Sequence, residues 1–230
     1  MDFSSFTHIS FDCYGTLIDW EAGMLPVLRR MLAHHGRTLA DGAILELYGE
    51  FEAAAEGGPY RSYRHVLQSV VRAFGERLGF QPSASEILGM HESVPAWPPF
   101  GDTVAALQRL KKRYKLAVIS NIYNAMFDET RKLLRVEFDT VITAEDAQSY
   151  KPSPRNFQLA LNALATSPRQ LLHAGQSIYH DVVPARALGI ATVWVNRKSA
   201  RPGIGAVLAA KGEPDLEVPD LASLAAAAGV

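Results

Sequence analysis

The 230-residue sequence predicts an α/β fold in which a doubly wound parallel sheet is interrupted by an inserted helical domain. After residue 100, short apolar runs of strand length alternate with helical periodicity, as is typical of parallel sheets. Between residues 19 and 96 the periodicity is helical, and no strand-like run interrupts it. We therefore expect a core domain of residues 1–18 and 97–230, and a helical cap domain of residues 19–96.

The first predicted element is a strand over Thr7 to Phe11, which ends in a turn containing Gly15. In the cap, an apolar stripe marks the third helical segment as core-facing, and Ser83 and Glu86 form a capping box at the start of the fourth. Gly- and Pro-containing turns separate these segments, which cover 21–35, 41–56, 60–78 and 83–91.

The rest of the core is expected to alternate between strands and helices. Residues 197–219 are rich in Gly and Pro and predict no element, whereas 220–228 predict a closing helix. The expected strands cover 116–120, 138–142, 171–174 and 191–195, and the expected helices cover 102–113, 125–134, 154–164 and 180–188.

Composition narrows the class of protein. The 23 basic and 24 acidic residues nearly balance, which argues against nucleic acid or an anionic membrane as a partner. Cys13 is the single cysteine, so no internal disulfide can form, and the N-terminal residues resemble neither a signal peptide nor a membrane span. We expect a cytoplasmic protein that acts on a small anionic molecule, and a homodimer stays open.

Polar residues follow several of the predicted strands. Asp12 comes directly after the first strand, at the sheet edge where open α/β folds bind ligands, and is a candidate nucleophile. Its alternative role is to close a turn or cap a helix. Ser120 and Asn121 end another strand, and Lys151 stands just before a helix. A further strand leads into a loop and helix start that carry Gln176 and Asp181.

Together these segments read Asp-x-x-Gly-Thr, Ser-Asn, Lys-Pro and Gly-x-Ser-x-x-x-Asp, and in this order the chain resembles the haloacid dehalogenase (HAD) superfamily. It looks most like the L-2-haloacid dehalogenase branch, which carries Tyr two residues after the nucleophile, as Tyr14 does here. The resemblance implies a HAD-like Rossmannoid core, a helical cap and hydrolase activity.

Two substitutions favour attack at carbon over phosphoryl transfer. Phosphatases of the superfamily carry acids where this chain has Tyr14 and Gln176. Phosphoryl transfer needs a proton for the leaving alkoxide and Mg²⁺ to screen the phosphate, whereas halide leaves without a proton. We therefore expect no cofactor. The alternative is a Mg²⁺-dependent phosphatase or phosphonatase, in which Mg²⁺ would bind at Asp12 and Asp181. A third alternative is an inactive binding protein on this fold.

The expected mechanism is attack by Asp12 on C2 of a short 2-haloacid, followed by hydrolysis of the aspartyl ester. Thr16 would orient Asp12, Lys151 would keep it ionised, and Asp181 would hold Lys151 or the water. Ser120 would bind the substrate carboxylate and Asn121 the departing halide. The other residues expected to bind substrate are Cys13, Tyr14, Gln176, Arg61 and Arg64.

The substrate pocket departs from the dehalogenase pattern. The branch carries Arg, Tyr, Ser and Asn at positions that align here with Gly49, Phe157, Gln176 and Ile178. Because Gly49 cannot clamp a halide, we expect Arg61 or Arg64 of the cap to do so, although ordinary solvated arginines are an equally good interpretation. His173 and His180 are interpreted as packed side chains.

Overall fold

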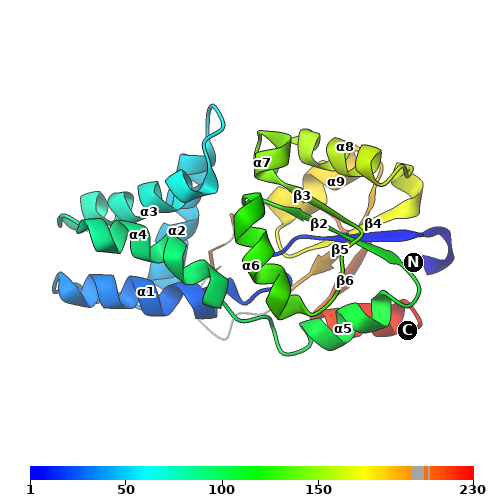
Figure 1. Ribbon diagram of the computed structural model, residues 1–230, viewed down its shortest axis with the longest axis horizontal. Coiled ribbons are helices and arrows are strands. Elements are labelled where there is room, and N and C mark those ends of the chain that lie inside the picture. Colours follow the sequence, from blue (N-terminus) through cyan, green and yellow to red (C-terminus); the bar gives the residue numbers. More distant parts are fainter. Residues whose placement is uncertain (198–204, 207) are drawn as a thin grey trace. The chain divides into compact units, whose positions relative to one another are not determined.

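The computed structural model describes residues 1–197, 205, 206 and 208–230. The six strands of the described residues form one parallel sheet in the order β3-β2-β1-β4-β5-β6 (Figure 1), which confirms the predicted α/β class. The order reverses at β1, so the sheet is doubly wound. The strands are β1 (His8–Phe11), β2 (Lys115–Ser120), β3 (Thr140–Thr143), β4 (Leu171–Gly175), β5 (Ala191–Val195) and β6 (Leu216–Val218).

The described residues form two compact units. The core unit comprises 1–19, 99–197 and 209–230, and the helical unit comprises 20–98 with residues 205, 206 and 208. Within the core unit, α8 and α9 lie on one side of the sheet, and α5 packs against α10 on the other (Figure 1). The core-unit helices are α5 (Thr103–Leu110), α6 (Asn124–Leu134), α7 (Ala144–Ala147), α8 (Pro154–Ala163), α9 (Val183–Ala187) and α10 (Leu221–Ala227).

The central strands are buried on both faces, which explains why their sequences read as continuous apolar runs. Phe11 pairs with Val118 on one side and with Ala174 on the other. Because β1, β2 and β4 run in register and in parallel, the residues that follow them leave the sheet at the same edge. This register places Asp12 between the ends of two neighbouring strands.

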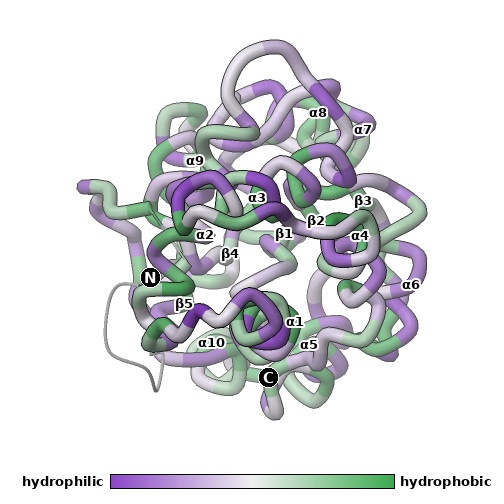
Figure 2. Tube along the Cα trace, turned by 90° about the vertical axis from the view of Figure 1, so that its left-hand side faces the viewer, coloured by the Kyte–Doolittle hydropathy of each residue, from purple (hydrophilic) through white to green (hydrophobic). Residues whose placement is uncertain are grey.

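The helical unit buries one face of each of its longer helices. The apolar stripe of α3 includes Val66, Val70 and Phe74, all of which are buried, and Phe74 meets Phe51 edge to face. Hydrophilic and hydrophobic residues alternate along these helices in Figure 2. The capping box predicted for Ser83 and Glu86 is confirmed. The helices are α1 (Trp20–His34), α2 (Asp41–Glu56), α3 (Tyr63–Leu78) and α4 (Ala84–Ser93).

Two local predictions in the core were wrong. The span 197–219, partly outside the described residues, contains the edge strand β6, which pairs with β5 through Val193 and Leu216. Only Val218 of β6 is buried, so its apolar signal is weak. The helix predicted over 180–188 is a π-helical turn, Ile178–Val182, followed by the short α9. None of the helices in the described parts is long and apolar enough to span a membrane.

Candidate active site

Asp12 leaves β1 into a turn that fixes its carboxylate at both oxygens. Its backbone N–H donates to the carbonyl of Ala174 on β4 at 3.0 Å, which extends the sheet by one residue. Oδ1 accepts from Lys151 Nζ at 2.9 Å, and Oδ2 accepts from Thr16 Oγ1 at 2.8 Å. Gly15, with φ 91°, provides the left-handed backbone that turns the chain back. The Asp12 side chain keeps 13% of its surface exposed, so a reagent can reach it.

Lys151 is a buried ammonium group with three acceptors. Its Nζ donates to Asp12 Oδ1 at 2.9 Å, to Asp181 Oδ1 at 2.6 Å and to the carbonyl of Ile119 at 2.9 Å. These acceptors use all three N–H bonds of the ammonium. Asn121 holds the backbone of Lys151 on both sides, because its Oδ1 accepts from Lys151 N at 2.7 Å and its Nδ2 donates to Lys151 O at 3.1 Å.

Asp181 is the second carboxylate on this ammonium. Its Oδ1 also contacts Nε2 of His173 at 3.2 Å, and its Oδ2 accepts from the backbone N–H of Ser177 at 3.2 Å. His173 Nδ1 in turn lies 2.9 Å from Ser10 Oγ. All of these side chains are buried. A continuous chain of hydrogen bonds therefore runs from Ser10 through His173, Asp181 and Lys151 to Asp12.

The two carboxylates differ in their pKa shifts. Burial raises the pKa of Asp181, but Lys151 and His173 outweigh burial and lower it, so Asp181 is ionised. Burial also raises the pKa of Asp12, and there it outweighs the attraction of Lys151, so the pKa lies above its usual range. Burial lowers the pKa of Lys151, yet the charges of Asp12 and Asp181 raise it overall. Lys151 is thus a fixed cation, and Asp12 is the carboxylate that takes up a proton more readily.

Thr16 links Asp12 to the loop after β4. While its hydroxyl donates to Asp12, Oγ1 accepts from the backbone N–H of Gln176 at 2.9 Å. The carbonyl of Gln176 accepts from Trp194 Nε1 at 2.8 Å, which anchors this loop to β5. The backbone of Gln176 therefore supports the predicted nucleophile.

Three further predicted residues lie beside Asp12 in sequence or at the same sheet edge. Cys13 is fully buried, and burial raises the pKa of its thiol well above the usual value. The Tyr14 hydroxyl shares a 2.7 Å hydrogen bond with Thr130 Oγ1 on α6, and burial raises its pKa in the same way. Ser120 is buried at the end of β2. Cys13 and Tyr14 are therefore neutral groups at neutral pH.

With this geometry in place, comparison with known proteins decides the family. The family model described as haloacid dehalogenase-like hydrolase matches residues 6–189. The chain belongs to this family. The match includes every predicted site residue of this HAD-like hydrolase, from Asp12 to Asp181.

Individual relatives include both dehalogenases and phosphatases. An (S)-2-haloacid dehalogenase of Pseudomonas sp. (strain YL) is 28% identical over 70% of this chain and 68% of its own length. A glyceraldehyde 3-phosphate phosphatase of Methanothermobacter thermautotrophicus is 27% identical over 82% of this chain and 84% of its own. The solved L-2-haloacid dehalogenase of Xanthobacter autotrophicus shares the fold, with a TM-score of 0.81 and 23% identity over 96% of this chain and 97% of that chain.

The donor set of this HAD-like hydrolase fits Mg²⁺ poorly. Mg²⁺ prefers six oxygen ligands, including carboxylates. Asp12 and Asp181 both accept from the Lys151 ammonium, and Gln176 is neutral at the position where the phosphatase pattern has Asp. The site therefore lacks a ready set of ligands for Mg²⁺.

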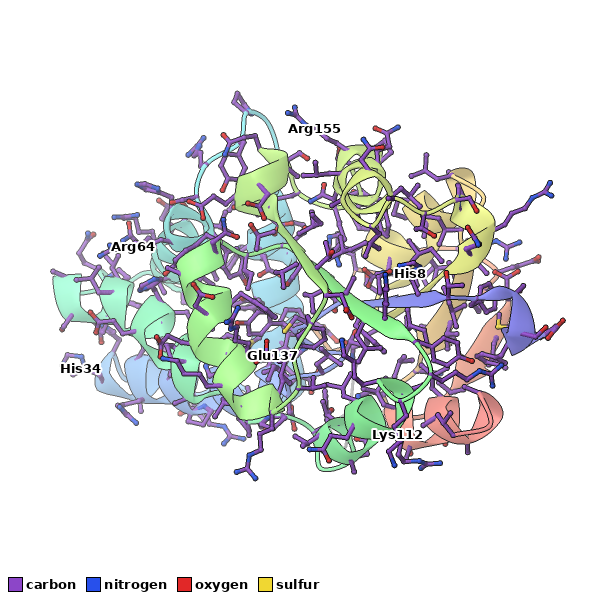
Figure 3. The ribbon with its side chains drawn as sticks, turned by 45° about the vertical axis from the view of Figure 1, so that its right-hand side comes forward. His8, His34, Arg64, Lys112, Glu137 and Arg155 are labelled. Atoms are coloured by element: carbon purple, nitrogen blue, oxygen red, sulfur yellow. The ribbon has the colours of Figure 1, made fainter. Side chains whose placement is uncertain are left out.

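The two predicted arginines belong to the helical unit, which is described by itself. Arg61 precedes α3 and Arg64 lies in its first turn, and both are exposed within that unit (Figure 3 labels Arg64). A Cβ atom at Gly49 would lie 2.8 Å from the carbonyl oxygen of Ala206, so a larger residue does not fit there without a shift of the backbone. An arginine at position 49 is therefore sterically disfavoured in this chain.

Sequence reasoning missed the role of His173 in this network. Its interpretation as a packed residue holds in part, since its ring packs edge to face against that of Phe157, with ring centroids 4.9 Å apart. The available signal was a polar residue inside each of two apolar strands. Ser10 on β1 pairs with His173 on β4, so both side chains point to the same face of the sheet. His180 is partly buried near Ser177, and burial lowers its pKa to about 4.

Proposed function

We propose that this HAD-like hydrolase removes halide from a short 2-haloacid through an aspartyl ester on Asp12. The observation that carries the proposal is the Asp12–Lys151 pair in a site whose phosphatase-type acids are replaced by Tyr14 and Gln176. Such a site offers a nucleophile and a fixed cation, without a proton donor for an alkoxide.

In the first step, a carboxylate oxygen of Asp12 attacks C2 from the face opposite the halogen. The new C–O bond forms as the C–halogen bond breaks, and the halide leaves with the bonding electrons. In the second step, water adds to the side-chain carbonyl of Asp12, and the ester bond between this carbonyl carbon and the substrate oxygen breaks. One proton of the water goes to the leaving oxygen to give the 2-hydroxy acid, and the other is released to solvent as the carboxylate is regenerated. Lys151 stabilises the negative charge on this carbonyl oxygen, and Thr16 orients the group.

The remaining residues are assigned to the substrate. Ser120 binds its carboxylate, and Tyr14 and the side chain of Gln176 form the pocket wall. Cys13, which the sequence also suggested as a substrate-binding residue, is fully buried and does not line this pocket. Asn121 contributes indirectly through its two hydrogen bonds to Lys151, in addition to the halide contact proposed from the sequence.

A single turnover in ¹⁸O-water tests the ester. Because water attacks the Asp12 carbonyl, the label should enter Asp12 and the first product should stay unlabelled. The measurement is mass spectrometry of the peptide containing Asp12 and of the hydroxy acid. Label in the product of that first turnover would mean direct attack by water and would exclude the covalent mechanism.

The phosphatase relative makes phosphate-ester hydrolysis a second candidate. A panel of 2-chloro- and 2-bromoacids of both configurations, assayed beside phosphate esters with and without Mg²⁺, separates the two. Halide release without phosphate release supports the proposal, and the reverse result would replace it.

A further inference from the structure

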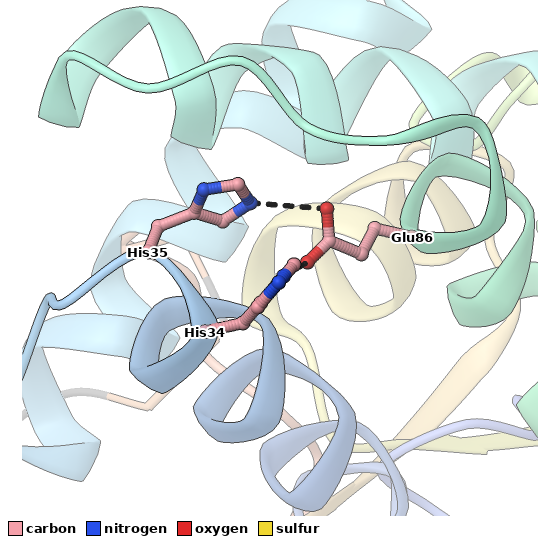
Figure 4. A group of neighbouring side chains, drawn as sticks. All are labelled: His34, His35 and Glu86. Atoms are coloured by element: carbon pink, nitrogen blue, oxygen red, sulfur yellow. Dashed lines mark hydrogen bonds and ion pairs between the residues drawn. The ribbon is translucent and has the colours of Figure 1, made fainter.

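Two histidines and a glutamate of the helical unit form a cluster that the proposed function does not use (Figure 4). His34 is the last residue of α1, His35 follows it, and Glu86 lies in the first turn of α4. His34 Nδ1 lies 2.9 Å from Glu86 Oε1, and His35 Nε2 lies 3.0 Å from Glu86 Oε2. One ligand-type atom from each residue lies within 4.8 Å of the other two.

Two of these three side chains are held in place by neighbours outside the cluster. Glu86 Oε2 accepts from the backbone N–H of Ser83 at 2.7 Å and from its hydroxyl at 2.9 Å. The His35 ring stacks on Phe80, with ring centroids 4.3 Å apart and an interplanar angle of 17°. Carboxylates that bind metals are usually fixed by such outer hydrogen bonds, and fixed ligands lose little entropy on binding.

The cluster is also open to solvent. The His34 side chain is 70% exposed, which gives an ion a path to the cluster. A cavity of about 300 Å³ borders the cluster at His34, Ser85 and Glu86.

We propose that His34, His35 and Glu86 bind a divalent transition-metal ion of the Zn²⁺ type. Two imidazole nitrogens and one carboxylate oxygen are ligands that Zn²⁺ accepts, and water would complete its coordination. The bound ion would join the end of α1 to the start of α4. Without an ion, the same residues form an ordinary pair of hydrogen bonds, and the experiment distinguishes the two.

The test is direct binding of Zn²⁺ to the full chain, with any affinity tag removed and metals stripped by a chelator. Calorimetry should show one ion per chain, and Co²⁺ should give visible absorption bands of a site with nitrogen ligands. His35→Gln and Glu86→Gln should each lower the affinity at least ~10-fold, because each removes one of three protein ligands. Gln at position 86 can still complete the capping box, so the start of α4 is retained.

The matched control is His65→Gln, which removes an exposed histidine of α3 in the same unit. This control should bind Zn²⁺ as the unaltered chain does. The proposal is overturned if calorimetry gives no one-to-one binding, if His65→Gln loses as much affinity as His35→Gln, or if Co²⁺ gives no bands with the unaltered protein. The Co²⁺ result needs no variant and is independent of any halide-release assay.

Discussion

Lys151 places one ammonium group between two carboxylates whose pKa values shift in opposite directions. Asp181 has additional donors in His173 and the Ser177 backbone, so the pKa of Asp181 is lowered. Asp12 has fewer compensating donors for its burial, and its pKa is raised. The two carboxylates therefore have different roles. Asp181 balances the charge of Lys151, and Asp12 remains the reactive group.

The opposite shifts predict opposite effects on stability. The unfolded chain binds a proton at Asp181 more readily than the folded chain, so ionised Asp181 stabilises the fold at neutral pH. That contribution is lost as pH falls through its lowered pKa. Asp181→Asn should lower the free energy of unfolding by about 3–5 kcal/mol, the usual effect of breaking a buried ion pair. Asp12→Asn should leave it unchanged or raise it, because its raised pKa means that ionisation opposes folding above that pKa.

Urea denaturation of both variants at neutral pH measures these effects, with the unaltered chain beside them. A larger loss of unfolding free energy for Asp12→Asn than for Asp181→Asn would contradict the charge assignment.

The raised pKa of Asp12 also predicts a pH dependence of turnover. We expect kcat/KM to fall on acidification through a pKa above 3.8, as Asp12 takes up its proton.

His173 supports Lys151 indirectly, through its hydrogen bond to Asp181. His173→Phe removes a hydrogen bond to a charged group, which is worth about 1.5 kcal/mol, and should lower kcat roughly 10-fold. KM should change little, because His173 acts through Asp181 and Lys151. His173→Gln can still donate to Asp181 and should recover part of kcat. His8→Phe, at a buried histidine near the start of β1, is the control and should retain turnover. Equal losses for His8→Phe and His173→Phe would indicate a packing effect alone.

At the scale of elements, most strands and helices could be predicted because their apolar periodicity is strong. The two errors have different causes. β6 is a three-residue edge strand that forms only by pairing with β5, and its sequence carries one buried residue. The turn Ile178–Val182 is capped at its N-terminus by the Ser177 side chain, which accepts from the backbone N–H of His180. Apolar periodicity gives no signal for such a local hydrogen bond.

The first turn of α3 supports a prediction about substrate binding. Arg64→Ala, and Arg61→Ala just before this helix, should lower kcat/KM by ~10²-fold on the best haloacid if these guanidinium groups stabilise halide or carboxylate. Stability should barely change, because both side chains are exposed within the helical unit. Arg72→Ala, an exposed arginine further along α3, is the matched control. Near-normal turnover in both single variants and in the double variant would place the clamp elsewhere.

At the scale of the whole molecule, the sequence order of the motifs anticipated which residues would meet. Asp12, Thr16, Lys151 and Asp181 are separated by up to 169 positions and are joined by direct hydrogen bonds. A parallel sheet brings the ends of its strands to one edge, so this meeting could be inferred. The bonds of Asn121 to the Lys151 backbone and the place of His173 could not, because they depend on side-chain geometry.

We expect halide release by the whole protein not to depend on Mg²⁺. If the core site works through Asp12 and Lys151, exhaustive chelation should leave halide release unchanged, and added Mg²⁺ should not raise it. The assay is steady-state halide release, with a known Mg²⁺-dependent phosphatase treated in parallel as the control for chelation. A strict requirement for Mg²⁺ would favour phosphoryl transfer.

The single thiol of the chain offers a built-in reporter. Cys13 is fully buried next to Asp12, so thiol reagents cannot reach it while the turn after β1 is closed. Burial also raises the pKa of the thiol and keeps it in the unreactive protonated form. The rate of labelling under native conditions therefore reports opening at the active-site turn, without any engineered probe. It equals the opening rate when labelling is faster than reclosing, and otherwise equals the opening equilibrium constant multiplied by the labelling rate of a free thiol. Comparing that rate with the rate in denaturant would show whether the catalytic loop opens on its own or only when the whole core unfolds.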